Sequence, residues 1–564
     1  MLENPSIIID KDVPCKLRDG TILYSNIYRP QTNEAYPVLL TRHPYNKNLP
    51  DFSHRYVDPL ELARSGYVVI IQDVRGRFAS EGEFQPFIQE PKDGYDTVEW
   101  AANLSYSDGN VGMFGLSYYG FTQLYAASER PPSLKAIFPA MSGRYFYDAL
   151  ISTGSIFHLG LFTTWLLDSV APDYLNRIQN PESHMKTIHQ DLNRIFDWYA
   201  YKPMKDWPPL HIHPSLGKLF TCYLYANERI IDEVHRKSEA KALDLPAYHL
   251  AGWYDCFLES SLKNYQEMKE SSSVQKLIVG PWSHGNFQAL IGERFFGNQS
   301  SGSSIEHKES LTSLHIKWFD RWLKNQGETD LETEPVQLFI MGVNEWRGEQ
   351  EWPLARTKYT PYYLSSDGNA HQYSAKLTPQ LPSSVGYDSY IYDPENPVST
   401  RGGGTLFYLG MNSGPVDQQD WKRREDILVY TSSVLEEPLE VTGPVKVILY
   451  AASDVPSTDF TAKLIDVCPE GNAYNLTDGI NRVAVSSGEV QRYEIEIGST
   501  SNVFFPGHSL RVEISSSSFP QYDVNPNTGG STLESTEMQK ARQVIYQGEK
   551  YPSHILLPVI AQIQ

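Results

Sequence analysis

Short apolar runs alternate with amphipathic helical patterns over the first 142 residues of the chain. The apolar runs occupy 37–41, 67–71, 111–114 and 134–138. Helical patterns occupy the segments near 58–65 and 93–104, and another follows Gly120 and runs to about 128. Strands that are apolar on both faces and are separated by helices predict a parallel sheet with both faces covered. Alternating residues at 10–17 and 21–28 predict an antiparallel hairpin before the first of these strands.

The pattern changes three times further along the chain. From 143 to 242 the apolar strand pattern stops, and helix-like segments separated by prolines predict a helical insertion. Apolar strands then return at 247–251 and 276–279, with helices predicted at 256–269 and 310–325. Beyond 346, short alternating segments separated by Gly, Pro, Asn and Ser are typical of a β-sandwich or jelly roll. The predicted organisation is an α/β core (1–142 and 243–345), a helical cap (143–242) and an all-β jelly-roll domain (346–564).

The apolar run at 111–114 leads directly into Gly115-Leu116-Ser117-Tyr118-Tyr119-Gly120. A serine on a sharp turn between a strand and a helix forms a nucleophile elbow, and small residues must flank that strained turn. Gly115 and Gly120 supply them, although the second glycine of the usual pattern stands one position earlier, where this chain has Tyr119. The helix that follows directs its first amide groups toward whatever the serine attacks. Ser117 is therefore the candidate nucleophile.

A serine nucleophile needs a base, and the base needs a carboxylate to orient it. In α/β-hydrolases these residues follow in the order Ser, Asp, His, on loops after successive strands. Asp255 follows the predicted strand at 247–251, and His284 follows the strand at 276–279. Because the carboxyl ends of parallel strands meet at one edge of the sheet, Ser117, Asp255 and His284 are expected to come together there.

The chain has 15 histidines, so other candidate bases have to be considered. His249 lies inside a predicted strand and is expected to be a core residue. His43 is close to Tyr45 and is the one rival near the presumed site. His211 and His213 would share a face in an extended segment, but no Cys or carboxylate cluster accompanies them, so no metal site is predicted.

The negatively charged oxygen of a tetrahedral intermediate needs hydrogen-bond donors. The backbone N–H of Tyr118, the residue after the nucleophile, is one candidate. The loop after the strand at 37–41 should supply the other, and Tyr45 lies in that loop. From the residues alone, Tyr45 is either a hydroxyl donor to the oxyanion or a packed loop residue.

Five motifs occur in order at Pro44-Tyr45-Asn46-Lys47, Asp73-Val74-Arg75-Gly76, Gly115 to Gly120, Gly252-Trp253-Tyr254-Asp255 and Gly280-Pro281-Trp282-Ser283-His284. Together they resemble the cocaine esterase family, whose relatives include Xaa-Pro dipeptidyl peptidases, α-amino acid ester hydrolases and cephalosporin acylases. The likeness continues at Trp346-Arg347, 392–403 and Ser518-Phe519-Pro520, so it covers nearly the whole chain.

The resemblance implies an α/β-hydrolase core with an inserted helical cap and a C-terminal jelly roll, in agreement with the division above. It implies that Ser117, Asp255 and His284 form a catalytic triad. It also implies that the Tyr45 hydroxyl and the Tyr118 amide form the oxyanion hole.

The substrate pocket is harder to predict. Phe257 and, in the cap, Trp165 resemble the aromatic residues that line the acyl pocket of the family, and Phe407 in the β domain is a further candidate. Amino acid ester hydrolases of the family have acidic residues just after the catalytic aspartate, whereas here the first acid is Glu259. An apolar or aromatic acyl group is therefore favoured over a substrate ammonium.

The formal net charge of −20 and the pI of about 5.2 argue against a nucleic-acid partner, which would require clustered Lys and Arg. The first twelve residues lack the pattern of a signal peptide, and no apolar run approaches the roughly 18–20 residues that span a bilayer. The cysteines lie far apart and are expected to be free thiols in a reducing compartment: Cys15, Cys222, Cys256 and Cys468. Together these features predict a cytoplasmic protein with no membrane partner.

The sequence thus predicts a serine hydrolase that cleaves carboxylic esters, or amides, through an acyl-serine intermediate. The expected partner is a small-molecule substrate, no metal or organic cofactor is expected, and a homo-oligomer is an open possibility. One alternative is an Xaa-Pro dipeptidyl peptidase, which would need an anionic group such as Asp168, Asp173 or Glu182 of the cap to bind the substrate's α-amino group. A more remote alternative is a catalytically silent protein whose jelly roll binds carbohydrate.

Overall fold

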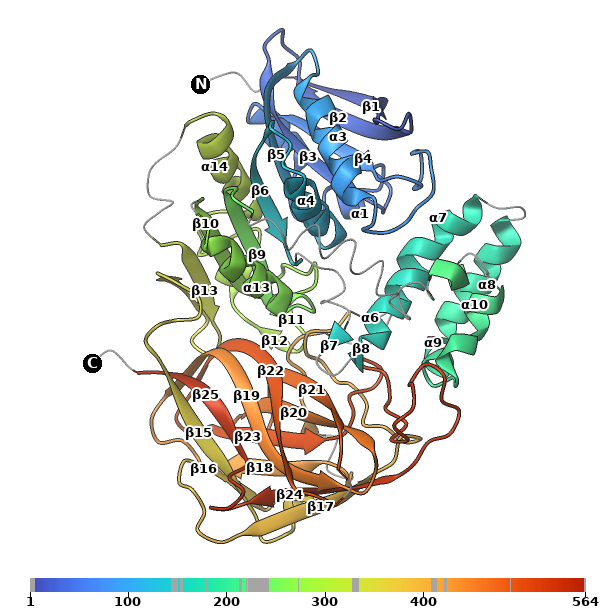
Figure 1. Cartoon of the computed structure of the whole chain (residues 1–564). Coiled ribbons are helices and arrows are strands. Elements are labelled where there is room, and N and C mark those ends of the chain that lie inside the picture. The colour runs from blue at the N-terminus through green and yellow to red at the C-terminus, as the bar shows by residue number, and fades with distance from the viewer. Residues whose placement is uncertain are drawn as a thin grey trace.

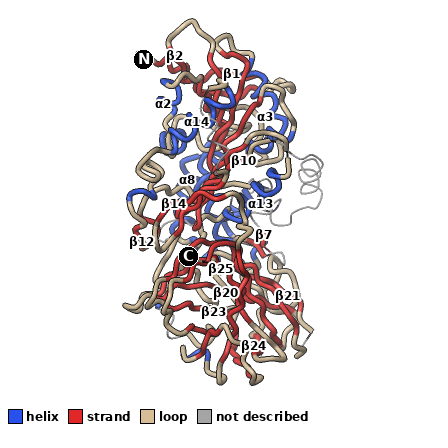
Figure 2. The backbone as a smooth tube through the Cα atoms, turned by 90° about the vertical axis from the view of Figure 1, so that its left-hand side faces the viewer, coloured by secondary structure: helices blue, strands red, loops and turns tan. Residues whose placement is uncertain are grey.

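The computed structural model describes residues 6–143, 151–152, 156–177, 181–212, 216–219, 221, 243–271, 273–326, 334–406, 413–419, 424–486 and 488–561. These residues form a sheet with flanking helices, a group of helices beside it, and a β domain below (Figure 1). The turned view shows the N-terminal sheet and the β domain stacked end to end (Figure 2). The predicted pocket residue Phe407, together with Cys222 and His213, lies outside the described residues.

Ten strands form one mixed sheet in the order β1-β2-β4-β3-β5-β6-β9-β10-β13-β14. Their bounds are β1 Ile7–Lys16, β2 Ile22–Pro30, β3 Tyr36–His43, β4 Val68–Asp73, β5 Ser107–Leu116, β6 Leu134–Ala140, β9 Ala247–Tyr254, β10 Gln275–Ser283, β13 Val336–Ile340 and β14 Glu345–Glu349. Neighbours from β4 to β13 are parallel, and β1, β2 and β14 pair antiparallel at the two edges. The predicted hairpin and parallel sheet are confirmed. Strand β14 extends this sheet past residue 345, where the β domain was expected to begin.

Helices cover both faces of the sheet because alternate residues of its strands point in opposite directions. In β5, Val111 and Met113 share an apolar cluster with residues of α3 (Glu90–Ala102) and α4 (Tyr118–Ser128). The neighbouring Gly112 instead faces Phe319 of α14 (Leu311–Leu323), which also contacts α2 (Pro59–Arg64). Helix α13 (Leu258–Lys269) packs on β9 and β10, and the short α1 (Pro50–Ser53) follows the β3 loop.

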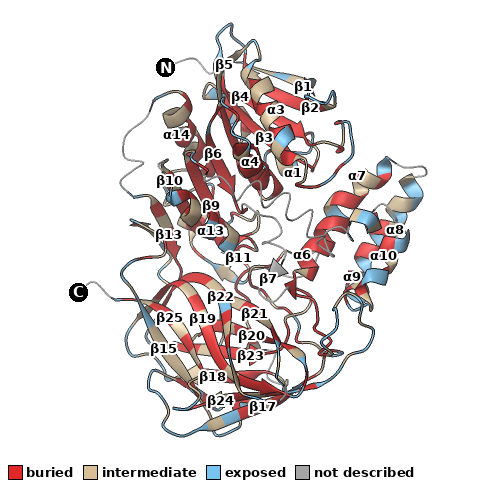
Figure 3. Cartoon of the chain, in the orientation of Figure 1, coloured by how far each residue is buried: buried red, intermediate tan, exposed pale blue. Residues whose placement is uncertain are grey.

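The described chain between β6 and β9 is mostly helical, which confirms the predicted insertion. Its elements are β7 Ile151–Ser152, β8 Ile156–Phe157, α6 Leu159–Thr164, the π-helix η1 Trp165–Val170, α7 Ala171–Asn176, α8 Pro181–Asn193, α9 Ile195–Tyr199, the 3-10 turn η2 Met204–Asp206 and α10 Pro208–Ile212. Helices α6 and α7 are largely buried, whereas α8 presents an exposed outer side (Figure 3). Among the described helices, none has the length and apolar character needed to cross a lipid bilayer.

The C-terminal part is built from strands, as predicted. They are β15 Thr357–Ser365, β16 Ala375–Thr378, β17 Gly386–Tyr392, β18 Leu428–Ser432, β19 Leu439–Ser453, β20 Ser457–Val467, β21 Ala473–Ala484, β22 Gln491–Phe504, β23 Ser509–Ser515, β24 Ala541–Gln547 and β25 His554–Ile560. Their order is β17-β24-β19-β25-β15-β16-β18-β23-β20-β21, with β22 beside β19. Every pairing is antiparallel except that of β16 with β18.

The short elements are β11 Leu290–Ile291, β12 Arg294–Phe295, η3 Asn298–Ser300 and η5 Ala370–Gln372. The β domain is tied to the rest of the chain by hydrogen bonds. The Glu259 carboxylate in α13 accepts from the Ser499 N–H at 2.6 Å, and the Asp523 carboxylate accepts from the Phe157 N–H at 2.8 Å. The β domain therefore contacts both the core and the inserted segment.

Candidate active site

Ser117 occupies the turn between β5 and α4 with φ 58° and ψ −124°. A positive φ is strained for a residue with a side chain and persists only where the surrounding structure holds it. The Ser117 N–H donates to the Ala140 carbonyl at 2.9 Å, and the Ser117 carbonyl accepts from the Phe121 N–H at 3.0 Å. These bonds fix the serine to the neighbouring strand and to the helix that it starts.

The two glycines of the motif are required by close packing. A methyl group at Gly115 would overlap the Tyr119 backbone, and one at Gly120 would overlap the Ser142 side chain. Gly115 also has a φ of 154°. The predicted need for small residues on both sides of the turn is thus visible in the structure, even though the second glycine stands one position late.

Asp255 and His284 lie side by side at the same edge of the sheet. Each follows directly on the end of its strand, and these strands, β9 and β10, are parallel neighbours. His284 Nδ1 and Asp255 Oδ1 are 2.6 Å apart, and the two side chains are 7% and 0% exposed. A hydrogen bond this short in a buried setting fixes the orientation of the imidazole.

Ser117 and His284 line one pocket of about 260 Å³, together with Tyr45. The pocket is mainly apolar, and its wall includes Phe52, Phe87, Phe121, Leu161, Trp165 and Phe257. A serine hydroxyl, an imidazole and a tyrosine hydroxyl therefore share a small cavity with aromatic walls.

Tyr45 is the second residue after β3, and its ring is stacked on Phe52 with centroids 4.6 Å apart. Its hydroxyl oxygen accepts a hydrogen bond from Trp165 Nε1 at 3.1 Å, and Tyr45 lines the same pocket as Ser117. Burial raises the pKa of Tyr45 to about 12. The hydroxyl therefore stays protonated at neutral pH and can donate to a negatively charged oxygen.

The Tyr45 loop is anchored by a buried ion pair. Lys47 Nζ lies 3.0 Å from Asp73 Oδ2, and the Lys47 N–H donates to Asp73 Oδ1 at 2.8 Å. Both side chains are fully buried, and Asp73 is the last residue of β4. Since β4 is the parallel neighbour of β3, this pair ties the loop to the adjacent strand.

Tyr118 is the first residue of α4, a position whose amide has no carbonyl four residues earlier within the helix. Its side chain is anchored away from the serine, because its hydroxyl donates to Glu90 Oε1 at 2.8 Å. Glu90 is in turn paired with Arg42 at 2.8 Å, and both are buried. The network holds the start of α4 in place under Ser117.

The two predicted pocket aromatics within the described residues both line the Ser117 pocket. The ring of Phe257 stands edge-on to the His284 ring, with centroids 5.2 Å apart and planes at 84°. The ring of Trp165 is nearly parallel to that of Tyr118 at 6.4 Å. The pocket wall also includes Arg55, Phe52 and Phe87 from the segment between β3 and α3, which no sequence motif marks.

The rival histidines are structural. His43 is fully buried, burial lowers its pKa to about 3, and its Nδ1 accepts from the Tyr45 N–H at 3.2 Å. His249 is buried between Gln275 and Asn264, at 3.1 and 3.2 Å from its two ring nitrogens. Of the three, His284 is the histidine that lines the pocket of Ser117.

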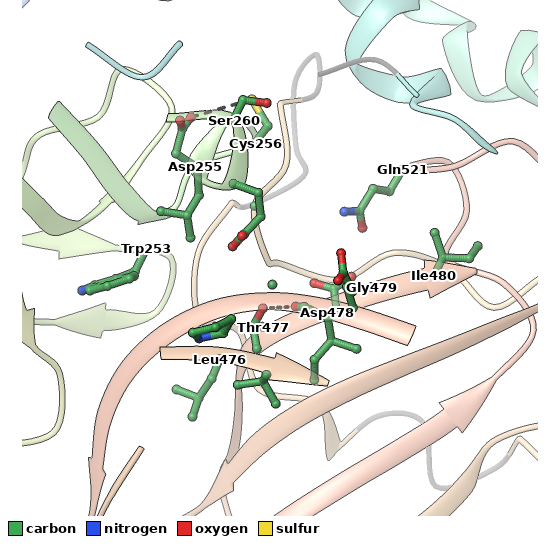
Figure 4. Close-up of a pocket in the computed structure, with 18 of the residues that line it drawn as sticks. Trp253, Asp255, Cys256, Ser260, Leu476, Thr477, Asp478, Gly479, Ile480 and Gln521 are labelled. Atoms are coloured by element: carbon green, nitrogen blue, oxygen red, sulfur yellow. Dashed lines mark hydrogen bonds between the residues drawn. The ribbon is translucent and has the colours of Figure 1, made fainter. Parts of the chain in front are cut away.

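A larger cavity of about 490 Å³ lies between the start of α13 and strands β19, β21 and β22 (Figure 4). Its wall includes Asp255, Cys256 and Glu259, with Asp478 and Gln521 from the β domain. Neither Ser117 nor His284 is among the described residues that line it. The smaller pocket therefore holds the nucleophile, and the larger one is the gap between core and β domain.

Two groups of side chains have donor atoms close enough to share a metal ion: Asp255, Cys256 and His284, and Asp466, Cys468 and His508. In the first group, burial raises the pKa of the Cys256 thiol well above its usual value, which disfavours the thiolate that a metal would need. In the second group, the Arg294 guanidinium approaches the Cys468 sulfur at 4.0 Å, and its charge would repel a cation. The donor chemistry of both groups suits a metal ion poorly.

Two family models match most of the chain. Residues 19–286 match the X-Pro dipeptidyl-peptidase (S15 family) model, and residues 330–556 match the X-Pro dipeptidyl-peptidase C-terminal non-catalytic domain. The chain is 36% identical to the cocaine esterase of Rhodococcus sp. (strain MB1 Bresler), over 98% of each protein.

Solved structures share the fold over almost the full length. An aminopeptidase from the marine sediment archaeon Thaumarchaeota archaeon has a TM-score of 0.75 at 23% identity, covering 99% of this chain and 97% of that one. An α-amino acid ester hydrolase has a TM-score of 0.73 at 24% identity, with the same coverage. With the cocaine esterase match over nearly the whole of both sequences, these findings show that the chain is a serine esterase of the cocaine esterase (CocE/NonD) family, related to Xaa-Pro dipeptidyl peptidases.

Proposed function

We propose that this esterase hydrolyses carboxylic esters with an apolar or aromatic acyl group, through an acyl-serine intermediate formed on Ser117. The observation that carries the proposal is the single pocket whose wall contains Ser117, Tyr45 and a His284 already hydrogen-bonded to Asp255. These are the groups that acyl transfer requires: a nucleophile, a base with its orienting carboxylate, and a donor for the oxyanion.

In the acylation step, His284 Nε2 takes the proton of the Ser117 hydroxyl while the oxygen attacks the acyl carbonyl. Asp255 accepts from Nδ1 at 2.6 Å and stabilises the imidazolium that forms. The Tyr45 hydroxyl and the Tyr118 amide donate to the negatively charged oxygen. Collapse of the intermediate breaks the bond to the leaving oxygen, which receives the proton from His284.

In the deacylation step, water replaces the alcohol. His284 takes a proton from the water as it attacks the acyl-serine carbonyl, and the same donors bind the second oxyanion. The proton then passes to Ser117 as the acid leaves, so the enzyme returns to its starting state. An amide substrate would follow the same steps with an amine as leaving group.

The acyl preference rests on the pocket wall. Phe257, Trp165 and Phe121 surround a volume of about 260 Å³, which is large enough for a ring and offers it aromatic contacts. Glu259, the first acid after Asp255, is directed to Ser499 of the β domain and lines the other cavity. It does not place a negative charge beside Ser117.

An Xaa-Pro dipeptidyl peptidase is the second candidate function, and one observation favours it. Asp168 of η1 lines the Ser117 pocket, where its carboxylate is available to an α-amino group. Of the other cap acids, Asp173 is engaged by Arg77 and Arg177 at 3.6 and 3.4 Å. Membership in a family of serine hydrolases leaves the non-catalytic, carbohydrate-binding alternative without support.

The test compares p-nitrophenyl esters of increasing acyl size with Gly-Pro- and Ala-Pro-p-nitroanilide. Ser117→Ala should lower ester turnover by roughly 10⁴-fold or more, because no nucleophile remains. Ser128→Ala, at the far end of the same helix, is the matched control and should be unchanged. A kcat/KM that rises from acetate to benzoate supports the aromatic acyl pocket. Anilide turnover that Asp168→Asn abolishes would favour the peptidase, and an active Ser117→Ala enzyme would refute both.

A further inference from the structure

The hydroxyl of Tyr45 is held by the cap. Trp165 Nε1 donates to the Tyr45 oxygen at 3.1 Å, and both residues are 8% exposed. An indole N–H can only donate, whereas a phenol has one proton to give and two lone pairs to accept with. The Tyr45 proton therefore cannot point to Trp165. It is left for an acceptor in the pocket that Tyr45 shares with Ser117.

The backbone around this pair is held by a second residue, Arg77, which is fully buried. Its Nε donates to the Pro44 carbonyl at 2.9 Å, immediately before Tyr45. Its two terminal nitrogens donate to the carbonyls of Val170 and Ser169, both at 2.9 Å. These carbonyls end η1, the π-helix that begins at Trp165. One guanidinium thus spans the Tyr45 loop and the helix of Trp165.

Other contacts hold the planar guanidinium group of Arg77 in place. Its guanidinium lies 5.0 Å from the ring centres of both Phe78 and Phe84. Asp173, in the next helix of the cap, lies 3.6 Å from it and balances its charge. A planar group with three directed bonds fixes the relative position of its partners better than a single point charge does.

We propose that Trp165 and Arg77 are positioning residues for the oxyanion hole: Trp165 turns the Tyr45 proton toward the reacting carbonyl, and Arg77 holds cap and loop together so that this bond persists. The inference rests on the proposed role of Tyr45 in the esterase. It gives Trp165 a second task beyond forming the pocket wall. A hydrogen-bond donor that already points at the developing negative charge does not have to reorient during the reaction. A hydrogen bond that the phenol oxygen accepts also strengthens the hydrogen bond that its O–H donates.

The test is a double-mutant cycle with p-nitrophenyl acetate, whose acetyl group is too small to depend on the aromatic wall. Tyr45→Phe should lower kcat about 100-fold, the loss of one oxyanion donor. Trp165→Phe keeps an aromatic side chain, although a smaller one, and removes the N–H. It should lower kcat about tenfold with KM changed less than about twofold, because the lost interaction acts in the transition state. In the Tyr45→Phe background, the same change should have no further effect on kcat.

Trp207→Phe is the matched control, because Trp207 is a buried cap tryptophan outside the Ser117 pocket, and its kcat should equal that of the wild type. Arg77→Lys keeps the positive charge but removes the planar guanidinium with its three directed hydrogen bonds. It should lower kcat about tenfold, again without effect when Tyr45 is already Phe. Thermal melting of each variant shows whether it is folded. If Arg77→Lys is unfolded, the Trp165→Phe cycle alone tests the proposal.

If Trp165→Phe lowered kcat by the same factor in the wild type and in Tyr45→Phe, the proposal would be overturned, since Trp165 would then act independently of Tyr45. An unchanged kcat in Trp165→Phe, or in Tyr45→Phe, would also overturn it. The proposed function fails differently, through an inactive wild type or an active Ser117→Ala enzyme. The two failures are therefore distinguishable.

Discussion

At the scale of single residues, the nucleophile depends on how closely α4 approaches the strand beside it. Ser117 has a positive φ, and the structure around it leaves no room for a side chain at Gly120, which faces Ser142 and lies close to the Ala140 carbonyl. The Ser117 N–H is bonded to that same carbonyl. Any displacement of α4 therefore moves the serine directly.

Gly120→Ala should lower both activity and stability. The added methyl group must push α4 away from Ser142, at a cost of about 1–3 kcal/mol for overpacking, and kcat should fall at least about tenfold as Ser117 moves relative to His284. Urea unfolding and p-nitrophenyl acetate turnover measure the two effects. Adding Ser142→Gly removes the main overlap and should restore part of both. A Gly120→Ala enzyme with wild-type kcat would show that this packing does not position the serine.

At the scale of elements, the cap is fastened to the β domain by a buried charge cluster. Arg482 of β21 bonds both oxygens of Asp459 at 2.8 Å and one oxygen of Asp523 at 3.0 Å. The second oxygen of Asp523 accepts from the N–H of Phe157, at the entry to the cap. The two carboxylate side chains are 1% and 0% exposed. The cluster connects a strand of the β domain to the segment that leads into α6.

Arg482→Met should destabilise the protein by about 3–5 kcal/mol, because it leaves two buried carboxylates without their cation. The control is Arg492→Met, which removes an arginine that is 51% exposed and pairs with Glu494 at 3.3 Å, and it should change stability by less than about 1 kcal/mol. Urea unfolding measures both. Adding Asp459→Asn and Asp523→Asn to Arg482→Met should recover stability. Equal effects of the two arginine variants would contradict the importance of burial.

The regular elements could be predicted from the sequence, and the contacts between distant elements could not. Apolar strands and amphipathic helices are local patterns, so the predicted helices at 58–65, 256–269 and 310–325 lie within two residues of α2, α13 and α14. The order Ser117, Asp255, His284 placed three residues at one sheet edge because parallel strands share that edge. In contrast, Arg77 donates to backbone carbonyls more than 90 residues away. Every residue has such a carbonyl, so no sequence pattern predicts these bonds. The π-helical turn at Trp165 was likewise indistinguishable from an α-helix.

At the scale of the whole molecule, the pocket is assembled from all three parts of the chain. The core supplies Ser117 and His284, the cap supplies Trp165 and Asp168, and Leu406 comes from the segment between β17 and β18. Hydrogen bonds join the β domain to the core and to the cap, and the buried Arg77 side chain joins the cap to the core. Conditions that destabilise buried groups throughout the molecule should therefore destabilise the active site as well.

Alkaline pH is such a condition, because buried tyrosines occur both in the core and in the β domain. Burial raises the pKa of Tyr45 and of Tyr265 in α13 to about 12, and it also raises the pKa of Tyr390 and Tyr430 in the β domain. An unfolded chain loses these protons near pH 10, whereas the folded chain retains them. The folded state then binds more protons, so the free energy of unfolding must fall as pH rises above about 10.

We expect the free energy of unfolding in urea to begin to decrease near pH 8.5, where the buried thiols of Cys15 and Cys256 keep protons that the unfolded chain loses, and to decrease more steeply above about pH 10. Each tyrosine whose pKa is raised by one unit contributes up to about 1.4 kcal/mol to the loss. Tyr265→Phe tests one contribution, because the Tyr265 hydroxyl has no hydrogen-bond partner among the described residues. That variant should match the wild type at pH 8 and lose less stability at pH 11. If instead all 36 tyrosines ionise near pH 10, as followed at 295 nm, while circular dichroism stays native, then the buried hydroxyls are not protected and Tyr45 would lose its proton in the same range.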